Sequence, residues 1–312
     1  MDARSAPHGN RSHLLRLMVP ALMVVIAFGL LPLGIASATA RQPEWECSPA
    51  AGAETASAPA ATPVGRPAPV AFPPEGGNLT VFAAASLTDA FEAIAADLEA
   101  ANANLSITYN FGGSQALVTQ LREGAQADLF ASANTAQMDA AAEAGLIAGE
   151  PVAFVRNRLS IITPADNPAG IEGAADLAAE GLRLILAQPE VPAGRYARDS
   201  VCRMAEDPGT YGEAFRDRVA GNIVSEEEDI RDVLAKVALG EADAGIVYVS
   251  DGVAAGDAVH MIDIPNAVNV VATYPVAVLS EGDEALGAAF IAYLLSAEGQ
   301  ETLERYGFEP VQ

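Results

Sequence analysis

From Asn78 onward, apolar and polar positions follow two alternating patterns. Short apolar runs without a helical period, such as 79–84, predict strands. They alternate with segments such as 87–98, where apolar residues recur every three or four positions, as on one face of a helix. This alternation predicts an α/β fold with mainly parallel sheets.

Two of the predicted strands are longer than the others. Segments 152–163 and 268–279 are extended runs whose length suits a strand that passes from one lobe of a protein to another. The other predicted strands are 79–84, 105–111, 128–132, 182–187, 222–224 and 244–251. The predicted helices are 87–98, 117–121, 135–146, 176–182, one that begins at 195, 211–220, 225–240, 284–295 and 298–306.

The N-terminal part has a different pattern. Residues 1–16 contain three arginines and one acidic residue, 17–36 form an uncharged apolar run, and a small-residue motif ends at Ala40. This layout predicts a secretory signal that is cleaved after Ala40, or else an anchor that is retained, because about 20 apolar residues can also span a bilayer. Both alternatives export the rest of the chain.

Residues 41–77 predict a linker. They are rich in Pro and Ala and poor in large apolar residues, so they cannot bury enough surface to offset the entropy lost on ordering. We therefore expect a tether between the leader and a folded part that begins near Asn78.

The charge of the chain narrows the classes of partner. It has 41 acidic and 17 basic residues, a net charge of −24, and one lysine, Lys236. Nucleic acids and anionic membrane surfaces require clustered basic residues, so neither is an expected partner. An anionic ligand would have to be bound by neutral donors in a dry cleft, since the field of the whole protein repels it.

The cysteines and histidines argue against a metal centre or a Cys–His catalytic site. Cys47 and Cys202 lack metal-ligand spacing, and His8, His13 and His260 form no cluster with them. The two cysteines could form a disulfide in an exported protein or remain free thiols, and the sequence leaves both alternatives open.

Two serines stand where a predicted strand turns into a helix. We expect Ser86 at a helix N-cap, where its hydroxyl and the free N–H groups of the helix could bind an oxyanion. An ordinary capping serine, with Asp89 completing a capping box, is the simpler interpretation of that junction taken alone. Ser114 repeats the arrangement after Gly112 and Gly113, and the pair would meet at the carboxyl edge of a parallel sheet, where α/β proteins bind ligands.

Two further predicted helices have first turns with candidate binding groups, which are free N–H groups in one helix and acidic side chains in the other. The helix predicted from Arg195 would leave the N–H groups of Ala193 and Gly194 exposed. The acids of 226–229 lie in the first turn of the helix predicted at 225–240, and we interpret them as favourable charges at a helix N-terminus rather than as binding residues.

With these residues laid out, the sequence from about Asn78 to Pro310 resembles the molybdate-binding proteins of bacterial ABC transporters. The resemblance lies in 84–91, 111–114, 127–133, 191–194 with Tyr196, 240–251, and Tyr274 with Pro275. It implies a two-lobed periplasmic-binding-protein fold of type II, in which each lobe is a mainly parallel sheet flanked by helices. Lobe 1 would comprise 78–157 and 272–312, lobe 2 would comprise 158–271, and two segments would cross between them.

The resemblance also implies a site. Ser86 and Ser114 would offer hydroxyl and backbone N–H groups to a tetrahedral oxyanion, Ala193 and Ile230 would offer backbone N–H groups, and Tyr248 would offer its phenol. Ile230 stands where a valine is expected, a change of little consequence because only the backbone would be used. No residue would bind a metal cation directly, since molybdenum enters as an oxyanion, and no cofactor is implied.

The resulting hypothesis is an exported, monomeric protein that binds molybdate, and tungstate with it, for a membrane permease. It would work in the periplasm or on the outer face of the cytoplasmic membrane, tethered if the anchor is retained. A sulfate-binding protein is the nearest alternative. An enzyme on the same fold is a further one, but the sequence contains no nucleophile–base–acid set, P-loop or dinucleotide-binding glycine pattern.

Overall fold

The structure, a computed structural model, describes residues 45, 47 and 71–311. The strands in these residues are β1 (Gly77–Ala84), β2 (Leu105–Gly112), β3 (Leu129–Ala131), β4 (Ile147–Pro164), β5 (Leu184–Ala187), β6 (Ile223–Glu227), β7 (Ala244–Tyr248), β8 (Val259–Asp263), β9 (Val271–Leu279) and β10 (Glu309–Pro310). They join in the order β2-β1-β3-β9-β4-β7-β5-β6, with β8 and β10 also paired to β4. The α/β prediction is confirmed.

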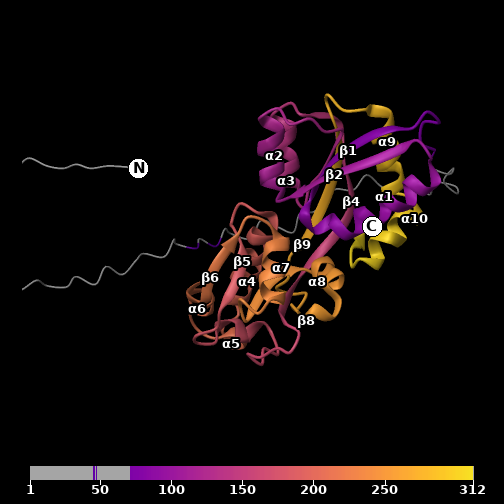
Figure 1. The fold of residues 1–312 in the computed structure, drawn as a ribbon. Helices are drawn as coiled ribbons and strands as arrows, with labels where there is room; N and C mark the ends of the chain where they lie inside the picture. Colours follow the sequence, from indigo (N-terminus) through magenta and orange to yellow (C-terminus); the bar gives the residue numbers. More distant parts are fainter. Residues whose placement is uncertain (1–44, 46, 48–70, 312) are drawn as a thin grey trace, which may run out of the picture. The chain divides into compact units, whose positions relative to one another are not determined.

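Strand β4 connects two regions of this sheet. Its first part pairs antiparallel with β9, as far as Arg158 opposite Val271, and its last part pairs antiparallel with β7 and β8. On one side of this pair β1 runs parallel to β2 and β3, and on the other β5 runs parallel to β6 and β7. Figure 1 shows β4 and β9 side by side between two groups of helices. The two long extended segments are therefore the strands that join the two regions.

The helices cover the two sheet regions separately. Around β1–β3 and β9 lie α1 (Thr88–Ala101), α2 (Ser114–Arg122), α3 (Thr135–Glu143), α9 (Glu284–Leu294) and α10 (Ala297–Arg305) (Figure 1). Around β5–β8 lie α4 (Pro192–Ala205), α5 (Pro208–Tyr211), α6 (Phe215–Asn222), α7 (Ile230–Ala238) and α8 (Val249–Ala255). Short 3₁₀ turns are η1 (Ala85–Leu87), η2 (Ala174–Ala178) and η3 (Gly256–Ala258).

The hydrophobic pattern explains how these helices are held. In α1 the buried positions Phe91, Ile94 and Leu98 recur every three or four residues and face the sheet. The Phe91 ring packs edge-on against Phe290 and tilted against Phe154. Helices on both sides of the sheet thus bury apolar faces, and the ends of the strands remain available for polar groups.

Three predicted helices differ from the structure. Segment 176–182 contains only the end of the 3₁₀ turn η2, and the residues after Ala178 are not helical. Segment 211–220 is broken, because α5 ends at Tyr211 and the chain turns through Ala214, whose φ is 55°, before α6 begins. Segment 225–240 starts as a strand, since residues 223–227 complete the parallel ladder with β5. Helix α7 begins only at Ile230, where Asp229 caps it. Tertiary pairing therefore overrides the local helical pattern at 225–227.

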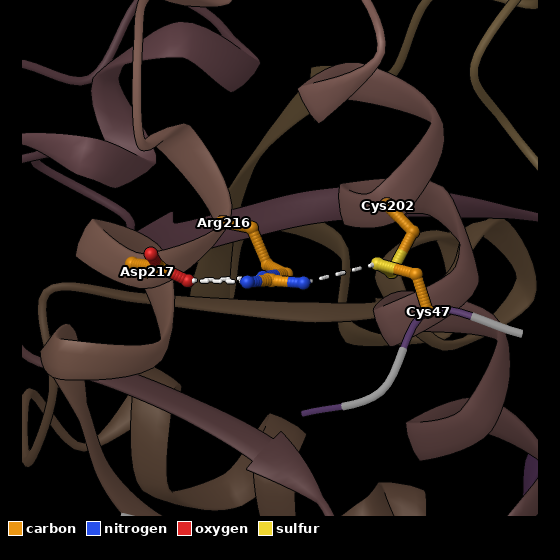
Figure 2. Close-up of a disulfide and its surroundings, with 4 residues drawn as sticks. All are labelled: Cys47, Cys202, Arg216 and Asp217. Carbon is orange, nitrogen blue, oxygen red and sulfur yellow. Dashed lines mark hydrogen bonds and ion pairs between the residues drawn. A yellow bond between two sulfur atoms is a disulfide. The ribbon is translucent and has the colours of Figure 1, made fainter. Parts of the chain in front are cut away.

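The predicted leader, 1–40, lies outside the described residues, as does most of the predicted linker, 41–77. Within that linker, Trp45 packs partly buried against the core and Phe72 is buried. Cys47 forms a disulfide with Cys202 of α4, which decides the question that the sequence left open (Figure 2). In the part of the chain that the structure describes, no helix combines the length and apolar character needed to cross a membrane.

Candidate functional site

A small pocket lies where the first turns of several helices meet, between the two sheet regions. Four of the five predicted binding residues line it: Ser86, Ser114, Ala193 and Ile230. The volume that the centre of a water molecule can reach is about 10 Å³, and a space of that size holds roughly one small group. The structure therefore brings these four residues together around a space too small for an organic ligand of ordinary size.

Ser86 is not the helix N-cap that the sequence predicted. It lies inside the turn η1, its side chain makes no capping hydrogen bond, and α1 begins two residues later. Its Oγ is instead 2.9 Å from the hydroxyl of Tyr274, a buried residue of β9. The Asn157 side-chain amide approaches the same Tyr274 hydroxyl at 3.4 Å and donates to Ser250 Oγ at 2.8 Å.

These contacts include a hydrogen bond between the Ser86 and Tyr274 hydroxyls in which either oxygen could be the donor. An amide N–H can only donate, so the Tyr274 hydroxyl accepts from Asn157, and it can still either donate to Ser86 Oγ or accept from it. When Tyr274 donates to Ser86 Oγ, the Ser86 proton is free to point into the pocket. In that arrangement Ser86 can donate to a ligand atom that accepts.

The Ser114 hydroxyl is also hydrogen-bonded to a buried neighbour, which in this case is a backbone N–H group. It is the first residue of α2, after the N-cap Gly113, and its Oγ accepts the backbone N–H of Ala133 at 3.0 Å. An accepting hydroxyl still has its own proton to donate. The neighbouring Gly113 is required by space, because a Cβ there would lie 2.7 Å from the carbonyl oxygen of Glu228 across the pocket. The prediction of a capping serine is wrong at this position too. The Ser114 side chain instead forms part of the pocket wall.

The other side of the pocket consists of backbone groups. Ala193 is in the first turn of α4, after Pro192, where N–H groups have no partner within the helix. Ile230 is the first residue of α7, and the capping carboxylate of Asp229 accepts from the next two N–H groups, those of Arg231 and Asp232. The cap thus leaves the Ile230 N–H to the pocket.

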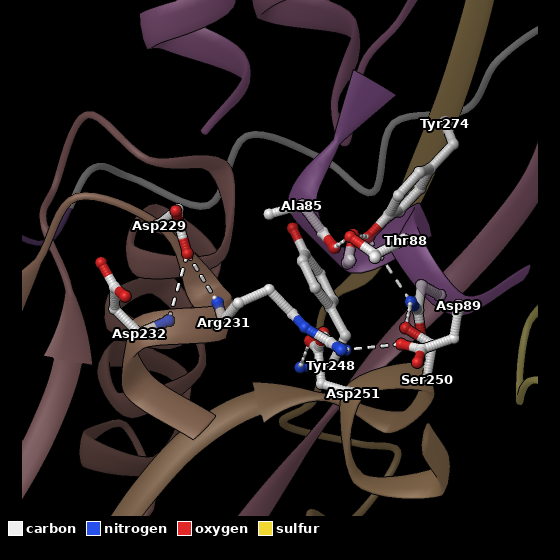
Figure 3. A network of polar contacts seen from close by, with 12 residues as sticks. Ala85, Thr88, Asp89, Asp229, Arg231, Asp232, Tyr248, Ser250, Asp251 and Tyr274 are labelled. Carbon is white, nitrogen blue, oxygen red and sulfur yellow. Dashed lines mark hydrogen bonds and ion pairs between the residues drawn. The ribbon is translucent and has the colours of Figure 1, made fainter. Parts of the chain in front are cut away.

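Tyr248, the fifth predicted residue, does not line this pocket. It is fully buried at the end of β7, and in Figure 3 its ring points toward the turn at Ala85. Its ring meets that of Tyr274 edge-on at 5.7 Å between centroids. Its hydroxyl is buried and makes no hydrogen bond of good geometry within the described residues. Burial raises the pKa of this phenol well above its ordinary value, so it keeps its proton and can donate it to a ligand.

The acids before α7 have separate roles. Glu226 forms an ion pair with Arg198, and Glu227 accepts from Lys236 Nζ at 2.7 Å and from Ser225. Burial opposes ionisation of Glu227, but the bonds from Lys236 and Ser225 outweigh it and lower its pKa. Asp229 acts as the favourable charge at a helix start that the sequence predicted, whereas Glu226 and Glu227 are paired with basic side chains.

A charged cluster joins the two sides beside the pocket (Figure 3). Arg231 Nη2 lies 2.8 Å from Asp89 of α1, and its Nη1 lies 3.7 Å from Asp251 of α8. Asp251 is completely buried, and this burial raises its pKa to about 7 although Arg231 opposes the shift. Gln115 adds a hydrogen bond to the Glu228 carbonyl at 3.0 Å. Asp89 therefore belongs to a contact across the pocket, and its predicted place in a capping box is wrong.

The donor set limits what the pocket can bind. Hydroxyl and backbone N–H groups line it, and the nearby Arg231 is paired with carboxylates. Among the described residues, no group of three His, Cys, Asp or Glu side chains could hold a metal ion. Sequence reasoning missed the roles of Asn157 and Tyr274. The available signal was the polar Asn157 in an otherwise apolar extended run.

Comparison with known proteins gives the family. A family model for bacterial extracellular solute-binding proteins matches residues 79–309. The chain belongs to this family. The molybdate-binding protein ModA of Mycobacterium tuberculosis is 41% identical to this solute-binding protein over 254 residues, 81% of this chain and 90% of the relative. ModA of Escherichia coli is 33% identical, over 74% of this chain and 89% of the relative.

A solved structure shows the same fold. The periplasmic molybdate-binding protein of Azotobacter vinelandii matches with a TM-score of 0.63 and 17% identity, over 75% of this chain and the whole of the other. The predicted periplasmic-binding-protein fold is confirmed. The family also confirms the prediction of an extracytoplasmic binding protein rather than an enzyme.

Proposed function

We propose that this solute-binding protein binds molybdate, and tungstate with it, in the pocket between Ser86 and Ser114 on one side and Ala193 and Ile230 on the other. The observation that carries the proposal is the convergence of these four neutral donor sites on a space of one small group. The molybdate-binding relatives support the choice of anion. Tyr248 would add its phenol from behind the η1 turn.

The chemistry of the pocket favours a fully ionised oxyanion. Each hydrogen bond to a charged acceptor contributes roughly 1.5–3 kcal/mol, so several neutral donors can hold a dianion without a cation. A protonated oxyanion would bring a hydrogen to a place where the partners are donors as well. Discrimination against sulfate would come from its smaller size, which leaves some donors out of reach.

Binding would involve closure of two lobes. We place lobe 1 at 78–157 and 272–312 and lobe 2 at 158–271, with β4 and β9 as the crossing strands. The limits are supported by the pairing of β4, which changes from β9 to β7 after Arg158. The contacts of Arg231 with Asp89 and of Gln115 with Glu228 would form only in the closed form, which the permease of an ABC transporter would recognise.

The protein would act outside the cytoplasm as a monomer. Its leader would be cleaved after Ala40 or retained as an anchor, and in the second case the linker would tether the binding domain to the membrane. Intact-mass measurement of the protein from its native host distinguishes the two fates.

Calorimetric titration with four anions tests the proposed function. We expect molybdate and tungstate to bind one per chain with similar affinity, sulfate to bind more weakly, and phosphate, which carries a proton near neutral pH, to bind weakest. Tighter binding of sulfate or phosphate than of molybdate would contradict the proposal.

A further inference from the structure

Two residues ahead of the folded domain contact helix α4 at two points of one face. Cys47 is bonded to Cys202, and the Trp45 ring lies under the guanidinium of Arg198, with Cζ 5.6 Å from the ring centroid. Positions 198 and 202 are four residues apart, so they are neighbours on the helix surface. We call Trp45 and Cys47 the strap.

Arg198, which the strap covers, holds three parts of the chain together. Its Nη1 donates to the carbonyl oxygens of Ala187, at the end of β5, and Gly194, in the first turn of α4, both at 2.8 Å. Its Nη2 pairs with Glu226 of β6. Burial lowers the pKa of this guanidinium while Glu226 opposes the shift, which shows how far the group is removed from water. A ring packed over it keeps water away and strengthens its hydrogen bonds.

The same turn carries a donor of the proposed site. Gly194 follows Ala193 directly, and a Cβ at Gly194 would lie 2.1 Å from the Gln188 carbonyl oxygen and 2.3 Å from that of Ala187. The first turn of α4 is thus packed closely on the end of β5, at the place where Arg198 bridges them. A small shift of this turn would move the Ala193 N–H away from the pocket.

We propose that the strap acts through Arg198 as a positioning element for the Ala193 N–H, so that oxyanion affinity depends on the Cys47–Cys202 disulfide. This inference rests on the proposed function. Trp45 and Arg198 are positioning residues, since neither lines the pocket.

A purely stabilising disulfide predicts something different. The bond joins residues 155 apart in sequence, and cross-linking a long loop stabilises a folded protein whatever the bond packs against. Its loss would then lower the unfolding temperature but leave the affinity of the folded protein unchanged. Affinity measured well below the unfolding temperature separates the two roles.

The chain provides its own spectroscopic probe, because Trp45 is its single tryptophan. In the parent, selectively excited tryptophan emission should change on addition of molybdate, with the midpoint found by calorimetry. In the C47S/C202S double variant we expect this change to disappear and the Kd to rise about 5- to 20-fold, as for a charge-assisted hydrogen bond that is weakened but not lost. Release should become faster, with little effect on association.

Substitutions at Trp45 test the ring without breaking the disulfide. Trp45→Phe keeps an aromatic face over Arg198 and should bind within about twofold of the parent, whereas Trp45→Ala should bind about 5- to 10-fold more weakly. Arg216→Ala is the matched control: Arg216 Nη1 lies 3.9 Å from Cys47 Sγ, but among the described residues its ion pair is with Asp217 and not with a partner of Arg198, so its loss should leave the affinity unchanged.

A ligand-free measurement keeps this inference separate from the proposed function. Hydrogen exchange of residues 187–195 should be faster in the double variant and in Trp45→Ala, while residues 79–87 keep the parent rate. Parent-like exchange in 187–195, or parent-like molybdate affinity in a double variant that merely melts earlier, would overturn the positioning role. A parent that binds no molybdate would defeat the proposed function, and the exchange rates would still decide whether the strap orders the α4 turn.

Discussion

The two sides of the pocket present different kinds of hydrogen-bond donor. On the first side, Ser86 and Ser114 present hydroxyl groups that are hydrogen-bonded to buried neutral partners, the Tyr274 hydroxyl and the Ala133 N–H. On the second side, Ala193 and Ile230 present backbone N–H groups at the starts of α4 and α7. Those helix starts are fixed by charged side chains around them.

Paired charges and neutral donors together explain how a strongly acidic protein can hold an anion. The charges that stabilise the second side are paired: Arg198 with Glu226 and Arg231 with Asp89. They set the position of donors without adding a free cation to the pocket. The first side needs no charge, because a hydroxyl that accepts one hydrogen bond is left to donate another. Selectivity would then reside in donor geometry on both sides.

The greatest loss of molybdate affinity is expected when the first turn of α4, on the second side of the pocket, is displaced. Gly194→Ala would force its Cβ within 2.1 Å of the Gln188 carbonyl oxygen, so the first turn of α4 must shift. A displacement of about 1 Å can cost on the order of 100-fold, and we expect a loss of molybdate affinity of that size in calorimetry. Gly221→Ala, where nothing lies within 4 Å, is the control and should bind normally. An unaffected Gly194→Ala protein would place the ligand away from α4.

On the first side, Ser114→Ala should weaken molybdate binding by about 1–3 kcal/mol, because it removes a hydroxyl donor and also leaves the Ala133 N–H without its acceptor. The change in Kd is about 5- to 150-fold. Ser106→Ala, at an exposed position of β2, should leave it unchanged. If Ser114→Ala bound like the parent, the serine would be structural only.

A smaller effect on affinity is expected from Tyr274, whose hydroxyl is hydrogen-bonded to Ser86. Tyr274→Phe removes the hydrogen-bond partner of the Ser86 hydroxyl without removing the serine, so affinity should fall by about 1 kcal/mol. Tyr109→Phe removes a hydrogen bond to the Phe91 carbonyl in the same sheet region and should lower stability but not affinity. Equal affinities for Tyr274→Phe and the parent would show that the Ser86–Tyr274 hydrogen bond does not contribute to ligand binding.

The smallest effect concerns the charged cluster of the second side. Burial raises the folded-state pKa of Asp251 to about 7, well above its unfolded value, so the folded protein binds the extra proton at lower pH. That contribution to stability is present at low pH and is lost as the pH rises through the folded pKa, amounting to about 1 kcal/mol between pH 6 and 8. Denaturant unfolding of the ligand-free parent should show this loss. Asp251→Asn should have a flatter profile, and parallel profiles would exclude Asp251 as the titrating group.

Much of this architecture could be predicted because it depends on local patterns. The apolar periods located β1, α1 and the long strands β4 and β9, and the resemblance brought together Ser86, Ser114, Ala193 and Ile230. Capping was predicted wrongly at both serines, because a serine before a helix has the same local sequence whether its side chain caps or turns toward a distant partner.

The contacts that hold the second side of the pocket in place could not be predicted from local sequence patterns. The partners of Arg198 and Arg231 lie on other elements, and residues 225–227 become a strand only because β5 is beside them. Trp45 and Cys47 fall in a segment whose composition predicts a linker, although their side chains pack on α4. Contacts between residues so far apart in sequence leave no periodic signal.

In the proposed site, one oxyanion lies between the two sides of the pocket and is held by donors from both. A crystal structure of the protein with molybdate, recorded with anomalous scattering from molybdenum, tests it most directly. We predict a single anomalous peak whose oxygen atoms lie within hydrogen-bonding distance of Ser86 and Ser114 Oγ, of the Ala193 and Ile230 N–H groups, and of the Tyr248 hydroxyl. A peak bound by one side alone, or located outside the pocket, would show that the two sides do not share one oxyanion.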